Sequence, residues 1–472
     1  MDELKQRMMD DILGEAGVQL TQDQEMALQV FMNFFRSDEP RCTYLLTGSA
    51  GTGKTFMINF FRKLLRKHGF KVILLAPTGR AAKVITRRSK SLAFTIHHHI
   101  YQVSEDGFGE VRFRSRNNKE GPRTVYIVDE ASMIGDQHDE TTRQGLLHDL
   151  LDYVFESNPD RKLVLVGDPV QLPPVGHNDS PALSGEYLED ILRLSLYAAH
   201  LSEVKRQEAA SGVLENAIRI RDSYLSTDQV HPELTTNREV HWLDNGYEGM
   251  ETYIGYYDPG NLDKCVFITY SNYRAVQVNQ AIRQQLYWNE ARLLEPGDML
   301  MVVRNNYAYS SERMPFLANG EMGTVIDIDW DSQEERYGLH WINAELEFAD
   351  SQQEAFQVSC KLVTDLLESK APQLTNQEMR KVMWARQQEY MDLPKKEANS
   401  LMRKDPYIQA LQVKFGYAIT GHKSQGGQWE NVVVGFEPNY SNDLKAYIRW
   451  TYTVFTRAEE RVFVLDCPFL TQ

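Results

Sequence analysis

The segment with the most specific chemical pattern runs from Gly48 to Thr55 and reads GSAGTGKT. It matches GxxxxGK[ST], in which glycines let backbone N–H groups wrap around phosphates, a lysine neutralises the β/γ oxygens and a hydroxyl binds Mg²⁺. The residues expected to bind the phosphates are Gly48, Ala50, Gly51, Thr52, Gly53, Lys54 and Thr55. A chance match in a turn is the alternative, but the flanking strand and helix patterns favour a phosphate site.

Two adjacent carboxylates, Asp129 and Glu130, directly follow the apolar run Val125–Val128. Ligands of open α/β sheets lie at the carboxyl ends of the strands. We therefore expect Asp129, together with Thr55, to hold a metal ion, and Glu130 to orient or deprotonate an attacking water. An acidic pair after a strand is more often only a turn, and it is the phosphate loop that favours the catalytic interpretation.

Positioning these groups requires strands that end in loops, and the first 230 residues alternate short aliphatic runs with helical patterns. This alternation is typical of a parallel sheet covered by helices. The runs are Thr43–Thr47, Lys71–Ala76, Thr124–Val128 and Lys162–Val166. Similar runs at 264–268, 431–436 and 461–465 predict a second, interrupted core, so the fold class is α/β with two cores.

Two insertions are expected within these cores. Tyr101–Val103 and Val111–Phe113 flank turn residues, which predicts a hairpin. The turn at Asn319-Gly320 lies among alternating β segments and predicts a small barrel, to which the polar helical stretch 373–403 belongs. The expected boundaries are 1–230 for the first core, about 98–121 for its hairpin, 231–295 and 408–472 for the second core, and 296–407 for the barrel insertion.

Composition excludes several classes of protein. The chain has 472 residues, 42% hydrophobic and 25% charged, and shows neither low-complexity tracts nor an apolar run long enough to span a membrane. The N-terminus is polar and acidic, so an intracellular, cytoplasmic location is expected. Four scattered cysteines predict no disulfide framework.

The charge distribution is uneven along the chain. The net charge is −15, yet the stretch from Pro40 to Ser104 contains no Asp or Glu and twelve Lys or Arg. Such a run is usually a solvated face. Because this one contains the phosphate loop, we favour a site for polyanions.

Ten strings, which include the phosphate loop and the acidic pair, occur in the order found in one protein family. They are LTQDQ, GSAGTGKT, APTGRAAK, TIHHHI, DEAS, GDPVQLPPV, EVKRQ, TYSNYRAVQVNQAIR, ITGHKSQGGQWENVVV and YTVFTRA, with NGEMGTV in the barrel segment. The chain thereby resembles the superfamily 1B helicases, in the group of the RecD, Pif1 and phage Dda proteins. The resemblance implies two RecA-like P-loop domains with ATP between them, a pin hairpin in the first and an SH3-like barrel in the second.

The resemblance also implies roles for residues around ATP. Gln24 is similar to the adenine-reading glutamine, although Thr21-Gln22-Asp23-Gln24 also fits a helix capping box. Gln171 resembles the γ-phosphate sensor, with a polar loop residue as the alternative. Arg206 and Arg457 resemble the arginines that reach the γ-phosphate, although an isolated arginine is normally a surface ion pair. Gly426 lies in a further ATP-binding motif.

The family's nucleic-acid contacts also carry over by position. In the first core the matching residues are Pro77, Thr78, Gly79, Arg80, Phe94, Thr95 and His97, and in the second they are Thr269, Asn272, Thr420, His422 and Lys423. Hydroxyls, amides, imidazoles and a few cations grip phosphates without reading bases. Phe108 and Phe113 are the pin candidates, and either could instead pack onto its own hairpin.

The function that the resemblance implies is an ATP- and Mg²⁺-dependent helicase. It would translocate on single-stranded DNA and unwind duplexes with 5′ to 3′ polarity. The expected partners are single-stranded DNA, junctions and DNA replication, repair or recombination proteins, with no membrane and a monomeric active form. An RNA helicase of the Upf1-like group and a non-translocating ATP-dependent switch are the alternatives.

Overall fold

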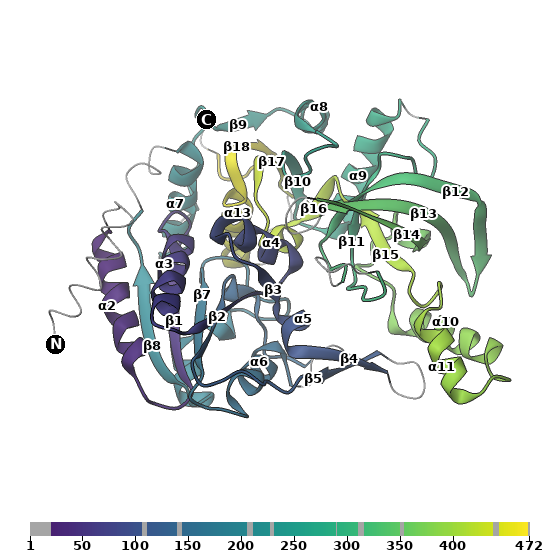
Figure 1. Ribbon diagram of the computed structural model, residues 1–472. Coiled ribbons are helices and arrows are strands. Elements are labelled where there is room, and N and C mark those ends of the chain that lie inside the picture. Colours follow the sequence, from purple (N-terminus) through teal and green to yellow (C-terminus); the bar gives the residue numbers. More distant parts are fainter. Residues whose placement is uncertain are drawn as a thin grey trace. The chain divides into compact units, whose positions relative to one another are not determined.

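The computed structural model describes residues 20–105, 111–138, 144–204, 211–226, 231–288, 290–309, 316–349, 354–437 and 443–470 (Figure 1). The chain folds into two compact units. The described residues of Met1–Pro77, Arg88–Gln102 and Ser115–Leu214 form the first, and those of Thr78–Arg87, Val103–Arg114 and Glu215–Gln472 form the second.

A parallel six-stranded sheet forms the centre of the first unit, in the order β3-β2-β6-β7-β1-β8. Its strands are β1 (Cys42–Gly48), β2 (Lys71–Ala76), β3 (Ala93–Thr95), β6 (Thr124–Val128), β7 (Lys162–Gly167) and β8 (Ser195–Leu201). Every residue of β6 and β7 is buried, as their continuous apolar character predicts. The predicted parallel α/β core is confirmed.

Helices complete this unit. They are α2 (Gln22–Arg36), α3 (Lys54–Lys67), α5 (Ile96–Ile100) and α6 (Leu146–Phe155), with α4 (Gly79–Ser89) and α7 (Gly212–Leu225) crossing the unit boundaries. The ring of Phe31 on α2 stacks on that of Phe61 on α3 with 3.8 Å between centroids, and Tyr44 of β1 meets both edge-on. This aromatic cluster packs α2 and the middle of α3 against β1.

The second unit contains a parallel five-stranded sheet in the order β16-β10-β17-β18-β9. Its elements are β9 (Val240–Leu243), α8 (Gly246–Tyr256), β10 (Cys265–Thr269), α9 (Asn272–Leu286), β16 (Ala418–Thr420), α12 (Gly421–Ser424), β17 (Trp429–Gly435), α13 (Leu444–Phe455) and β18 (Ala458–Leu465). Strands from two distant parts of the chain therefore share one sheet, as expected for an interrupted core.

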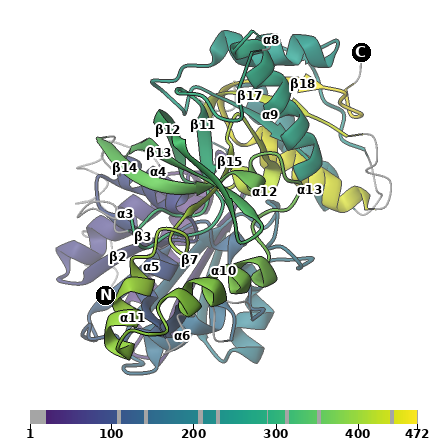
Figure 2. The same ribbon diagram turned by 90° about the vertical axis from the view of Figure 1, so that its right-hand side faces the viewer.

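A closed barrel interrupts that core. It consists of β11 (Met299–Val302), β12 (Met322–Arg336), β13 (Leu339–Ala349), β14 (Ala355–Val363) and β15 (Leu411–Phe415). The connection from β14 to β15 carries α10 (Asn376–Glu389) and α11 (Lys395–Arg403), visible in Figure 2. The predicted barrel is confirmed, and one apolar core containing Phe267, Leu300 and Leu346 joins it to the sheet.

The predicted hairpin is also confirmed, because β4 (Tyr101–Glu105) and β5 (Val111–Ser115) form a two-stranded sheet. Short helical turns complete the structure at η1 (Ala131–Met133), η2 (Pro181–Leu183), η3 (Tyr187–Ile191) and η4 (Thr364–Leu366). The four cysteines are buried and unpaired. Within the described ranges, no helix has the length and apolar character needed to cross a membrane.

Candidate functional site

The phosphate loop connects β1 to α3. Gly51 and Gly53 adopt φ values of +76° and +89°, a left-handed conformation that side chains other than glycine rarely tolerate. Gly53 is also the N-cap of α3, so no side chain caps the first-turn amides of this 14-residue helix. Those amides and the positive end of the helix dipole suit an anion such as a phosphate.

Lys54 points back onto this loop. Its Nζ donates to the carbonyl oxygens of Gly48 at 2.7 Å and Ser49 at 2.8 Å. It also lies 3.9 Å from Oδ2 of the fully buried Asp168. The sequence interpretation did not include Asp168, the second residue of the GDPVQ string, in which only Gln171 was singled out.

Asp129 and Glu130 lie at the carboxyl end of β6, as predicted. The backbone N–H of Glu130 donates to Oδ1 of Asp129 at 2.9 Å, and Glu130 has a φ of +53°. Burial and then the nearby charge of Glu130 raise the pKa of Asp129 to about 7. A carboxylate in this setting suits a bound cation, which would favour its ionised form, and Asp129 with the Thr55 hydroxyl is the pair suited to hold Mg²⁺.

Strand order brings these groups together. Strands β6, β7 and β1 are adjacent and parallel, so the loops at their carboxyl ends meet at one edge of the sheet. Gln171 follows β7 there, and its buried Oε1 accepts no hydrogen bond from any described residue. The first unit thus places Lys54, Asp129 and Gln171 on three neighbouring loops.

Gln24 takes the capping role that its sequence allowed and also contacts the phosphate loop. Thr21 and Gln24 form the capping box of α2, with 3.3 Å from the Gln24 N–H to Thr21 Oγ1 and 3.3 Å from the Thr21 N–H to Gln24 Oε1. The structure therefore confirms the capping role. The buried Nε2 of Gln24 also donates to the Thr52 carbonyl at 3.0 Å, which links the cap to the phosphate loop.

Substitutions at this cap separate the two roles. Thr21→Ala removes only the cap and is expected to lower the free energy of unfolding by about 1 kcal/mol without changing nucleotide affinity. Gln24→Ala is expected to lower stability similarly and also to weaken ATP binding. Chemical denaturation and binding of a fluorescent ATP analogue measure the two effects, and unchanged affinity in Gln24→Ala would leave capping as its sole role.

The second unit contains Arg457 and Gly426, two further residues that the sequence relates to ATP. Arg457 is buried, and its guanidinium donates to the carbonyls of Thr453 at 2.9 Å and Gly427 at 3.3 Å. Gly426 has a φ of +73°, and a Cβ there would lie 2.7 Å from the Cβ of Ala81. Arg206 lies outside the described residues.

In the first core, the candidate residues for binding nucleic acid lie near the ends of β-strands β2 and β3. These strands are adjacent, with Ala76 opposite Thr95, so Pro77 and Thr95 occupy the same sheet edge. The Thr95 hydroxyl caps α5 by accepting the His98 N–H at 3.2 Å. Phe94 stacks on His98 with 5.8 Å between ring centroids, whereas His97 approaches Tyr101 at 5.7 Å.

Thr78, Gly79 and Arg80 group with the second unit. At the start of α4, the Thr78 hydroxyl accepts a hydrogen bond from the Ala81 N–H at 3.2 Å. Ala318 packs so closely against Gly79 that a Cβ at this position would clash with it. Arg80 is already engaged, because its guanidinium lies 3.8 Å from the ring centroid of Trp429 and 2.8 Å from Oδ1 of Asp263. In this arrangement Arg80 organises α4 rather than presenting a free cation.

The candidate residues for binding nucleic acid in the second core also lie at one edge of a β-sheet. Thr269 and Thr420 are register partners at the ends of β10 and β16. The exposed residues Asn272 and His422 are the first residue of α9 and the second of α12, the helices that follow these strands, and Lys423 Nζ donates to Asn319 Oδ1 at 2.5 Å. The structure therefore brings this predicted set together.

Two tyrosines on the same edge were missed. Tyr270 and Tyr273 are 41% and 50% exposed on either side of Asn272, and Lys370 Nζ lies 4.3 Å from the ring centroid of Tyr273. Exposed aromatic faces beside a cation suit base stacking. The pattern TYSNY in the sequence was the signal that could have identified them.

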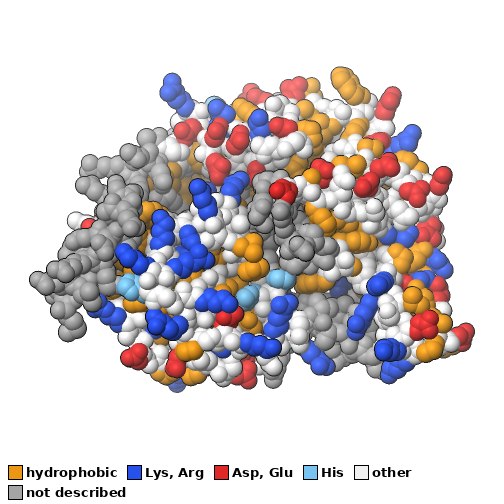
Figure 3. All heavy atoms as spheres, viewed as in Figure 1, with side chains coloured by type: hydrophobic (Ala, Val, Ile, Leu, Met, Phe, Trp, Pro, Cys, Tyr) orange, Lys and Arg blue, Asp and Glu red, His pale blue; other side chains and the backbone are white. Residues whose placement is uncertain are grey.

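The pin candidates are only partly described. Phe113 lies in β5, with its side chain outside the described part of the structure, and Phe108 lies outside the described residues. On the surface of the first unit, Lys and Arg side chains gather over α3 (Figure 3), where Lys63, Arg66 and Lys67 are exposed. This is the acid-free stretch that the sequence singled out.

Comparisons with known proteins agree with these features. A family described as "AAA domain" matches residues 19–243, and one described as "UvrD-like helicase C-terminal domain" matches residues 415–465. The chain is 30% identical over 190 residues to the ATP-dependent RecD2 DNA helicase of Deinococcus radiodurans, covering 40% of this chain and 24% of that protein. It is 28% identical over 214 residues to the ATP-dependent DNA helicase dda of Enterobacteria phage T4, covering 45% and 44%.

The chain thus spans less than half the length of these curated relatives. A crystal structure of Pif1 helicase from Bacteroides in complex with ADP-AlF3 and ssDNA aligns over 96% of this chain and 94% of that one, with 17% identity and a TM-score of 0.45. From the two family matches, which together cover more than half of its residues, and from its ordered motifs, the chain belongs to the RecD-, Pif1- and Dda-like group of superfamily 1B helicases.

Proposed function

We propose that the chain is an ATP-driven motor that translocates along single-stranded DNA in the 5′ to 3′ direction and unwinds duplex DNA. The observation that supports this most is the meeting of Lys54, Asp129 and Gln171 at the carboxyl edge of adjacent strands. Three loops at one edge of a parallel sheet are suited to bind and hydrolyse a nucleoside triphosphate.

The proposed roles follow the chemistry of each group. Lys54 and the loop amides bind the β- and γ-phosphates, while Thr55 and Asp129 hold Mg²⁺, which supplies charge neutralisation. Glu130 orients the attacking water, and Gln171 senses the γ-phosphate. Gln24 and Gly426 contribute to nucleotide binding, and Arg206 and Arg457 add guanidinium charge to the γ-phosphate in the ATP-bound state.

The strand-binding proposal rests mainly on the second unit. Thr269, Asn272, Thr420 and His422 lie at one edge of its sheet and offer hydroxyl, amide and imidazole groups to a sugar–phosphate backbone. ATP-dependent changes in the grip of the two cores on a strand would then produce directed steps. We propose a monomeric motor that meets junctions during DNA replication, repair or recombination.

Strand displacement on 5′-tailed and 3′-tailed duplexes is the most direct test. We expect ATP-dependent displacement of the 5′-tailed substrate only, and a stronger stimulation of ATP hydrolysis by poly(dT) than by poly(U). A clear preference for poly(U) would favour the RNA helicase, since a 2′-OH distinguishes the two polymers. ATP binding without stimulation by either polymer would favour the switch.

A further inference from the structure

The connection from β14 to β15 carries a helical arm, α10 and α11, whose attachment to the barrel is unusually polar. α10 begins with a capping box between Thr375 and Glu378 and buries Val382 and Arg386. The apolar contact of this helix with the barrel is small. Its position therefore depends strongly on polar groups.

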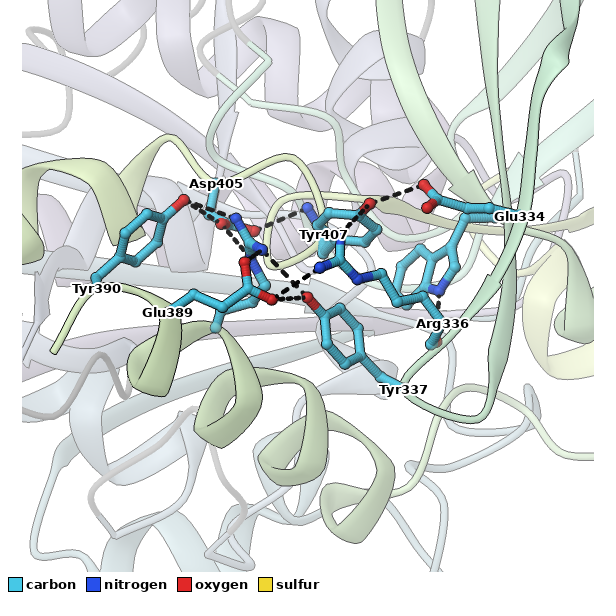
Figure 4. A network of polar contacts seen from close by, with 9 residues as sticks. Glu334, Arg336, Tyr337, Glu389, Tyr390, Asp405 and Tyr407 are labelled. Carbon is cyan, nitrogen blue, oxygen red and sulfur yellow. Dashed lines mark hydrogen bonds and ion pairs between the residues drawn. The ribbon is translucent and has the colours of Figure 1, made fainter.

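Arg386 is the centre of that attachment (Figure 4). Its Nε donates to Oδ2 of the buried Asp405 at 2.6 Å, and its terminal nitrogens donate to the hydroxyls of Tyr390 at 2.7 Å and Tyr337 at 3.1 Å. Arg386 also contacts Glu389. One side chain thus ties α10 to the end of α11 and to the turn between β12 and β13.

Further contacts extend this network across the barrel (Figure 4). Arg336 donates to Glu389 at 3.0 Å and to the Tyr407 hydroxyl at 3.3 Å, and Tyr407 in turn donates to Glu334 at 2.7 Å. Removing one member of such a network leaves its charged partners uncompensated. The arm is therefore held in one orientation on the barrel.

The opposite face of α10 is presented to solvent. Trp384 is 65% exposed, and Met391, two residues beyond the end of α10, is 69% exposed. Arg380 and Lys381 precede Trp384 by four and three residues, a spacing that places them beside Trp384 on the helix, and the Lys381 ammonium lies close to Gly338 in the turn between β12 and β13. Neither Arg380 nor Lys381 forms an ion pair with a residue that the structure describes.

The charge of the arm differs from that of the chain. Residues 376–404 contain seven Lys or Arg and four Asp or Glu, whereas the whole chain carries −15. Glu378 is occupied by the capping box and Glu389 by the Arg386 network. The exposed face of α10 therefore offers a large aromatic ring beside cations, and the neighbouring carboxylate of Glu378, three residues before Lys381, is engaged in the capping box.

This combination fits single-stranded nucleic acid. An exposed aromatic ring stacks on an unpaired base, and adjacent cations bind the flanking phosphates. A duplex hides its base faces. The arm also exposes Met391 (69%), Leu393 (36%) and Leu401 (40%), but its excess of Lys and Arg favours a polyanion over an apolar protein surface.

We propose that the α10–α11 arm binds the displaced single strand of a DNA fork through Trp384, Arg380 and Lys381. This inference rests on the proposed unwinding function. The tracking strand is assigned to the sheet edge at Thr269 and Thr420, and a fork supplies a second unpaired strand with free base faces. The arm would keep that strand from re-annealing.

Photo-crosslinking tests the contact without requiring unwinding. A fork with 5-iododeoxyuridine in either single-stranded arm is irradiated with the full chain in the absence of ATP, and adducts are mapped by mass spectrometry. We expect an adduct at Trp384 from the displaced-strand arm only. An adduct from the tracking arm alone, or none at Trp384, would overturn the proposal.

Unwinding assays with matched variants test whether the arm improves the unwinding of a fork. We expect wild type to unwind a fork about tenfold more efficiently than a duplex with only a 5′ tail, from the usual strength of one base stack with flanking cations. Trp384→Ala should lose this advantage, Trp384→Phe should retain most of it, and the control Met391→Ala should behave as wild type. All should unwind the 5′-tailed duplex equally.

The results that would contradict the proposed helicase function differ from those that would contradict the proposed role of the arm. If wild type unwinds neither substrate, the proposed function is wrong, and crosslinking still decides on the arm. If Trp384→Ala unwinds both substrates as wild type does, the arm proposal is wrong. A change in oligomeric state of Trp384→Ala by light scattering, without a crosslink, would identify the face as an interface between copies of the chain and would also overturn it.

Discussion

Lys54→Ala is expected to abolish ATP hydrolysis while the fold survives. Lys54 Nζ donates hydrogen bonds to two carbonyl oxygens of the phosphate loop and lies 3.9 Å from Asp168. Its positive charge is therefore located where the phosphates are proposed to bind. Losing a preorganised electrostatic contact of this kind lowers turnover by about 10²–10³-fold. Steady-state ATP hydrolysis with saturating poly(dT) measures the effect.

The matched control for this substitution is Lys63→Ala, at an exposed position on the same helix. It should hydrolyse ATP as wild type does, because it removes the same charge without touching the loop. Circular dichroism should show both variants folded. Full activity in a folded Lys54→Ala protein would show that the phosphate site has been assigned to the wrong residues.

Glu130→Gln is expected to separate nucleotide binding from hydrolysis. The amide keeps the size of the side chain, so Lys54, Thr55 and Asp129 remain available to bind Mg²⁺ and ATP. A general base that no longer takes a proton lowers the chemical rate by about 10²–10⁴-fold. Single-turnover hydrolysis should therefore fall while the affinity for a fluorescent ATP analogue stays within a few-fold of wild type.

Glu156→Gln, at an exposed carboxylate at the end of α6, is the corresponding control and should behave as wild type. The comparison with Lys54→Ala is informative, because that variant should lose affinity as well as turnover. If Glu130→Gln hydrolyses ATP at the wild-type rate, the water-activating role belongs to another residue. Equal loss of affinity in both variants would instead indicate that Glu130 acts by holding the metal site together.

Features carried by contiguous residues were predictable. The glycines of the phosphate loop, the acidic pair after β6 and the capping box at Thr21 follow from backbone conformations and spacings within a few residues. The buried strands were likewise visible as apolar runs, since a parallel sheet covered on both faces requires them. The barrel was predicted from only part of its strands, because β13, β14 and β15 carry no turn signal as distinct as Asn319-Gly320.

Contacts between residues far apart in the sequence could be identified only from the tertiary structure. Asp168 reaches Lys54 only because β7 pairs with β1, and Arg80 stacks on Trp429 only because α4 groups with the second unit. The same holds for the network that fastens α10 to the barrel through Arg386 and Asp405.

The physical reason is that a local motif depends on the torsion angles of a few neighbouring residues, which the residue types restrict strongly. A long-range contact depends on strand order and helix placement, and these emerge from the packing of the whole core. Residue types in the sequence therefore determined which chemistry this chain carries. Packing decided which cations are already paired, such as Arg80 and Arg386, and that Trp384 faces solvent.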